Sequence, residues 1–182
     1  MVRGAQAYGA KATDNGVSIR FGDPGGGKDG LTTNALGADP NDPNKVRAEG
    51  TVVFRSTLTG TNLEGTVAHE GSHVADAQEF VNTISPGGMD FDFSKNLTEY
   101  QTKVRAYKVS NSVLAAGNER ASKGMCGPSP CVLGTGLSSS QVARTIDQLL
   151  ANPLNGYETA PKYGISPSNQ GPRLYPSLTP PH

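Results

Sequence analysis

The sequence predicts an α+β fold that is mainly helical, with a small β-sheet and long loops rich in glycine and proline. The chain contains 23 Gly and 13 Pro among 182 residues, which indicates long irregular connections between few regular elements. Two segments repeat apolar residues at helical spacing, and a β-branched run at residues 51–58 predicts a strand. Because only 35% of the residues are apolar and Trp is absent, we expect one domain with a modest core.

We expect three regions along the chain. Residues 1–50 form a Gly-rich N-terminal region that packs on the domain or leads into it, with one short strand at residues 17–21. Residues 51–151 hold the core of the domain. Residues 152–182 show no periodicity and predict a coil that wraps the domain or frays.

The charge pattern argues against two classes of partner. The formal net charge is zero, the pI is near 6.8 and no run of Lys or Arg is present, so nucleic acid and anionic membranes are not expected partners. No apolar run is long enough to predict a membrane span, and the first residues lack the apolar stretch of a signal peptide.

Segment 22–29, G-D-P-G-G-G-K-D, matches a phosphate-binding loop as far as Lys28. Such a loop needs a Ser or Thr hydroxyl at the next position for magnesium, and this chain has Asp29 there. We therefore expect an ordinary flexible loop.

The sequence T-V-A-H-E-G-S-H-V-A-D contains His69, Glu70 and His73 in the order H-E-x-x-H. Residues four apart lie on one face of a helix, so both imidazoles can bind one metal ion, with the glutamate between them as a general base. The alternative is a surface helix that carries two histidines by chance. Thr61 or Asn62 can cap this helix, and the histidines fall half-buried at the edge of an apolar stripe, which favours the metal site. The stripe consists of Leu63, Val67, Val74, Val81 and Ile84.

A second helix is expected over residues 95–116, with Ser94 as its N-cap and Glu99 on the flank of its apolar stripe. A third helix is expected over residues 141–151, where Ser138 and Gln141 form a capping-box pattern.

With these residues the chain resembles the H-E-x-x-H zinc metallopeptidases of the gluzincin type. It looks more particularly like small metallopeptidase domains at the C-terminal ends of bacterial polymorphic and secretion-delivered toxins, over about residues 51–116. The resemblance implies a zincin-like fold, His69 and His73 as zinc ligands, Glu70 as general base, and Glu99 as the third ligand. The chain lacks the N-E-x-x-S-D pattern of better-known gluzincins around Glu99. Asp90, Asp92 and His182 therefore stay open as alternatives.

The resemblance implies a zinc-dependent hydrolase that cleaves peptide bonds in a protein substrate as a bacterial effector or toxin domain. Such a domain would be secreted or delivered by a bacterial secretion system as part of a larger protein, with a cognate immunity protein or delivery module as possible partners. A peptidoglycan amidase or peptidase with the same zinc site is one alternative function. A non-enzymatic binding domain is the other.

Four further expectations concern supporting groups. Strand 51–58 either holds a substrate backbone or is an ordinary core strand. Asp76 either orients an imidazole or is a solvated carboxylate. Tyr107 or Tyr157 can donate to an oxyanion, although core packing is the expected role of Tyr107. Cys126 and Cys131 flank a short Gly/Pro loop and either form a disulfide or stay as thiols.

Overall fold

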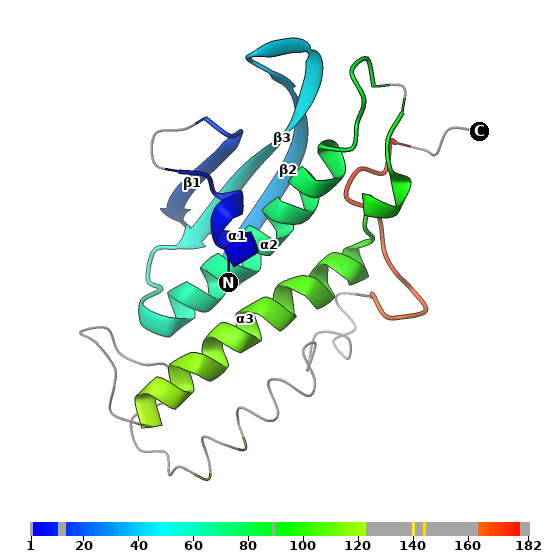
Figure 1. Cartoon of the computed structure of the whole chain (residues 1–182). Coiled ribbons are helices and arrows are strands. Elements are labelled where there is room, and N and C mark those ends of the chain that lie inside the picture. The colour runs from blue at the N-terminus through cyan, green and yellow to red at the C-terminus, as the bar shows by residue number, and fades with distance from the viewer. Residues whose placement is uncertain are drawn as a thin grey trace.

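The computed structural model describes residues 2–10, 14–88, 90–122, 140, 144 and 164–178. Helices and strands follow one another in an α+β arrangement (Figure 1). The third helix expected at 141–151, the cysteine pair, Tyr157 and His182 lie outside these residues, apart from Arg144. The elements are α1 (Val2–Ala7), β1 (Val17–Gly22), β2 (Gly30–Asp39), β3 (Asp42–Arg55), α2 (Gly60–Val81), the 3-10 helix η1 (Phe93–Lys95) and α3 (Glu99–Ser122).

The sheet has three strands in the order β1-β3-β2, with β1 parallel and β2 antiparallel to β3. The strand expected at 17–21 is confirmed, whereas β2 and the first half of β3 form where only loop was expected. Their small and polar residues alternate weakly in burial, so pairing between the two strands holds them rather than an apolar pattern. β3 is paired on both sides, so the expectation that this strand could hold a substrate backbone is wrong.

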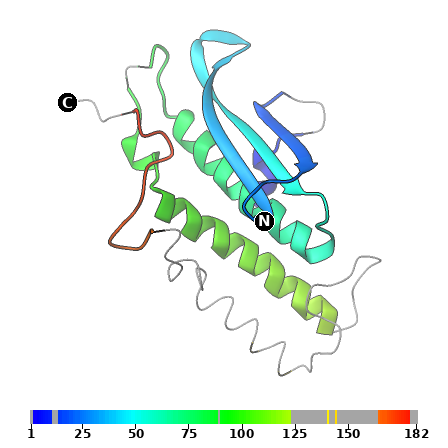
Figure 2. The same cartoon turned by 180° about the vertical axis from the view of Figure 1, so that it is seen from behind.

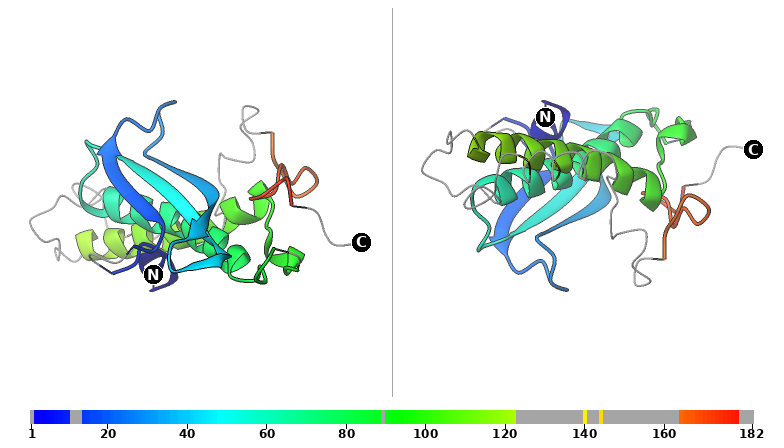
Figure 3. Two further views of the ribbon diagram at one scale, coloured as in Figure 1. Left: turned by 90° about the horizontal axis from the view of Figure 1, so that it is seen from above. Right: turned by 90° about the horizontal axis from the view of Figure 1, so that it is seen from below.

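Helix α2 lies in the middle of the molecule. The sheet covers one side of it and α3 runs antiparallel along another, so the structure has three layers (Figure 3). Residues 70–77 are consequently buried on every side of the helix, not along one stripe. The helix begins one residue after Thr59, which replaces the expected caps Thr61 and Asn62. None of the helices within the described ranges is long and apolar enough to cross a membrane.

Small residues bring α2 and α3 close together. A Cβ atom built on Gly117 would lie 2.1 Å from Cγ2 of Thr61, and one on Gly65 would lie 3.2 Å from Leu114. At this separation of the helices, any larger side chain at Gly117 would overlap the side chain of Thr61. This contact sets which residues of α3 face the motif helix.

The second predicted helix begins later than expected. Asp92 is the N-cap of η1 and accepts a hydrogen bond from the backbone N–H of Ser94, so Ser94 is not the cap of α3. The helical structure is interrupted at Asn96. The buried side-chain amide of Asn96 donates to the carbonyl of Tyr175 and accepts from its N–H, both at 3.0 Å. α3 then runs from Glu99 to Ser122, beyond the expected end.

The C-terminal segment 164–178 lies beside the start of α3 (Figure 2). Thr98 forms a β-bridge with Arg173, and the ring of Tyr175 stacks on Phe80 with 5.4 Å between centroids. The described part of the C-terminal tail therefore wraps the domain and holds the N-terminus of α3 in place.

Candidate metal centre

The two motif histidines project from successive turns of α2 toward α3. Their Nε2 atoms are 3.3 Å apart, and the ring of His69 also packs edge-on against Tyr107 of α3 at 4.6 Å. Tetrahedral zinc with Zn–N bonds of about 2.0–2.1 Å places two ligand nitrogens about 3.3–3.4 Å apart. The pair therefore fits two ligands of one zinc ion.

Burial keeps both imidazoles neutral. It lowers the pKa of His69 to about 3 and that of His73 well below the usual range, and the nearby charge of Lys103 acts in the same direction. Only a neutral imidazole offers a lone pair to a metal. His69 is half-buried as expected, whereas His73 is buried more deeply, with 8% of its surface exposed.

Glu70 is buried against strand β2. The hydroxyl of Thr32 donates to its Oε2 atom at 2.7 Å. Burial raises the pKa of Glu70, and the Thr32 hydrogen bond partly offsets this rise. A Cβ atom on Gly30 would lie 2.6 Å from Glu70 Oε1, so the carboxylate occupies the space of a missing side chain. Both partners escaped the sequence analysis because their strand was expected to be loop.

His69 and Glu70 line one cleft of about 520 Å³ between β2, α2 and α3. Its rim includes residues 27–30, so the end of the Gly-rich loop expected only to be flexible lies at the site. Gly25, Gly26 and Gly27 all have positive φ, a conformation that side-chain-bearing residues rarely adopt. Other lining residues are Asn62, Gly65, Thr66, Glu99, Lys103, Tyr107, Ser110, Asn111 and Leu114.

Glu99 lines the same cleft from the first turn of α3. Its backbone N–H donates to Pro172 at 2.7 Å, and Gly171 lies directly against its side chain. Within the described ranges, however, no three or more His, Cys, Asp or Glu side chains are grouped closely enough to share a metal. The structure thus places Glu99 in the cleft without grouping it with the histidine pair.

Lys103, one turn after Glu99, faces the pair directly. Its Nζ atom is 3.4 Å from Nε2 of His73. Sequence reasoning missed this residue, although its spacing of four from Glu99 puts both on one face of α3.

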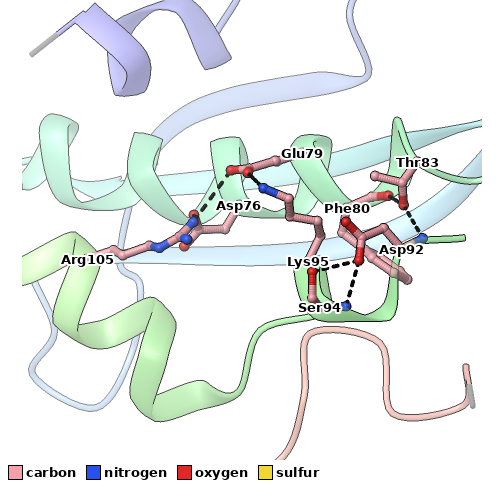
Figure 4. Close-up of polar contacts among 8 residues, drawn as sticks. All are labelled: Asp76, Glu79, Phe80, Thr83, Asp92, Ser94, Lys95 and Arg105. Atoms are coloured by element: carbon pink, nitrogen blue, oxygen red, sulfur yellow. Dashed lines mark hydrogen bonds and ion pairs between the residues drawn. The ribbon is translucent and has the colours of Figure 1, made fainter. Parts of the chain in front are cut away.

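The alternative acidic ligands lie elsewhere. Asp92 is exposed and bonded to the backbone and hydroxyl of Ser94, on the turn shown in Figure 4. Asp90 is exposed, and its backbone N–H donates to Ser85. Neither residue lines the cleft.

Asp76 is not the solvated carboxylate that was one expectation. Its side chain is 0% exposed and accepts a hydrogen bond from Arg105 of α3 at 2.9 Å (Figure 4). Glu79 bonds Lys95 at 2.6 Å and approaches Arg105 at 3.5 Å. These four residues, here called the ion network, tie α2 to η1 and α3.

Comparisons of the chain with models of protein families, with curated proteins and with solved structures find no match. The features that bear on function are therefore the histidine pair, the buried Glu70 and the cleft that His69 and Glu70 line.

Proposed function

We propose that the protein is a zinc-dependent hydrolase of the H-E-x-x-H type, with a zincin-like arrangement of helix and sheet, that cleaves peptide bonds in a protein substrate. One observation carries the proposal: two neutral imidazoles stand at zinc-ligand spacing, and one of them, His69, lines a cleft together with the buried Glu70. A pair of histidines that lay on a helix surface by chance would be solvated rather than buried in this way.

His69 and His73 would hold the metal, and Glu99 would supply the third ligand from the start of α3. Bound zinc would polarise the scissile carbonyl and make water acidic enough to react near neutral pH. Glu70 takes a proton from water and passes it to the leaving amine. Thr32 keeps one carboxylate oxygen in a fixed direction for this transfer.

An extended peptide suits the cleft. β2 is an edge strand, and Gly30 at its start lies on the cleft rim. A free strand edge can pair with the backbone of an extended segment, which presents its peptide bonds in a row. This arrangement supports a protein or peptide substrate.

The resemblance to toxin-borne metallopeptidases supports the wider proposal of a secreted or delivered bacterial effector. An immunity protein that blocks the cleft and a delivery module are the partners that such a domain would have.

Titration with zinc at concentrations above that of the protein tests the metal site. We expect one zinc per chain, loss of binding in His73→Ala, and weaker binding in Glu99→Ala. Glu119→Ala is the matched control, because Glu119 is an exposed glutamate farther along the same helix. A chain that binds no zinc under saturating conditions would refute the proposal, and full affinity in Glu99→Ala would end the assignment of that ligand.

A further inference from the structure

Two nitrogen atoms approach Nε2 of His73 at nearly equal distances, one from His69 and one from Lys103, which both line the cleft. Nε2 of His73 lies 3.3 Å from Nε2 of His69 and 3.4 Å from Nζ of Lys103. Both distances match the separation of about 3.3–3.4 Å between ligands of tetrahedral zinc. We propose that Lys103 occupies one of the two corners of the zinc site that the histidines leave open, so that position 103 sets the zinc affinity of this chain. This inference rests on the proposed zinc site.

The lysine side chain carries a positive charge that opposes a second cation. Its charge already acts on both imidazoles and on Glu70. In the absence of metal, it compensates the buried carboxylate in the way that zinc otherwise would. Like charges a few ångströms apart repel strongly in a partly desolvated site. Zinc therefore binds only when the ammonium of Lys103 moves away from the histidines.

The helix packing explains why position 103 faces the pair. α2 and α3 are antiparallel and held close at Gly65 and Gly117, and Tyr107, one turn after Lys103, packs on His69. Glu99 lies one turn before Lys103 and is not grouped with the histidines. A carboxylate that replaced the lysine would therefore reach the corner without any movement of the helices.

Zinc affinity, measured by competition with a chromophoric chelator, tests the inference in the purified chain. Lys103→Met removes the charge and keeps an unbranched apolar side chain, and we expect it to bind zinc about tenfold more tightly. Lys103→Glu adds a carboxylate ligand, and we expect it to bind zinc at least about a hundredfold more tightly. Lys108→Met and Lys108→Glu make the same charge changes at an exposed site on the same helix and should alter affinity by less than about twofold. Equal or weaker binding in both Lys103 variants overturns the inference.

Two outcomes of the zinc measurement separate this inference from the proposed function. If His73→Ala abolishes zinc binding while the Lys103 variants bind like the wild type, the zinc site stands and only the inference falls. If neither the wild type nor Lys103→Glu binds zinc, the zinc site itself is refuted. Cobalt(II) gives an independent readout, since Lys103→Glu should fill the site at cobalt concentrations that leave the wild type mostly empty, and its visible absorption should then be stronger at equal cobalt. Should Lys103→Glu fail to fold, Lys103→Met alone decides the question.

Discussion

Two neighbouring parts of the α2–α3 contact place cations against α2 in opposite ways. In the ion network, Asp76 and Glu79 of α2 each meet a cation from α3 or η1 (Figure 4). One to two turns earlier on α2, the histidine pair meets another nitrogen, Lys103. In the ion network, each carboxylate is balanced by a cation. At the histidine pair, by contrast, a positive charge lies beside two neutral nitrogen donors.

This difference separates a structural contact from a candidate functional site. A buried carboxylate that has lost its cation is costly, so the ion network stabilises the fold only as a complete set. The histidine pair is neutral and has no comparable need of Lys103. The contact of Lys103 with a neutral nitrogen therefore contributes less to stability than the ion network does, and functional sites are where selection acts on chemistry rather than on stability.

The largest expected effect is on catalysis. Glu70→Gln keeps the shape of the side chain and removes its basicity, so turnover should fall by roughly a hundredfold or more. Zinc binding should persist. Hydrolysis of a peptide substrate at saturating zinc checks this, and an unchanged rate would exclude Glu70 as the base.

Acid should destabilise the metal-free protein through the histidine pair. Both histidine pKa values are lowered in the folded state. Below about pH 6.5, the unfolded chain therefore binds protons that the native state does not bind. Stability is therefore fully present above a pH of about 6.5 and is lost toward pH 3, at about 1.4 kcal/mol per pH unit for each histidine. Denaturant unfolding between pH 7.5 and 5 measures the slope, which His69→Gln should roughly halve. A flat profile would show that the imidazoles are not buried as neutral groups.

Removal of Arg105 should weaken the fold without touching the metal site. Arg105→Met leaves the fully buried Asp76 without this ion pair and should lower the free energy of unfolding by about 2 kcal/mol. Arg120→Met is the control, because Arg120 and Glu64 are 43% and 56% exposed and the change should be within about 0.5 kcal/mol. If denaturant unfolding shows the same change in the free energy of unfolding for both variants, the ion network does not stabilise the fold.

The smallest effect concerns the support of Glu70. Thr32→Val removes the hydroxyl donor and should cost about 1 kcal/mol, whereas Thr32→Ser should retain most of the wild-type stability. Loss of this hydrogen bond raises the pKa of Glu70 further, so the acidic limb of the rate profile should move to higher pH in the Val variant only. If Ser and Val behave alike, the hydroxyl does not position the carboxylate.

Local spacing was enough to predict the motif helix, the short strand at 17–21 and the presence of a helix bearing Glu99. Helical geometry alone puts His69 and His73 on one face, whatever surrounds them. β2 could not be predicted in the same way, because its small polar residues become a strand only when β3 pairs with them.

By itself the sequence determined which residues share a face of each helix, because that depends on a repeat of 3.6 residues. Only the tertiary structure decided which face meets which. The close approach at Gly117 and the break at Asn96 set the register of α3, and this register places Lys103 against His73. Contacts across 30 or more residues of chain, such as those of Lys103 with His73 and of Thr32 with Glu70, depend on packing of the whole domain, which no local pattern encodes.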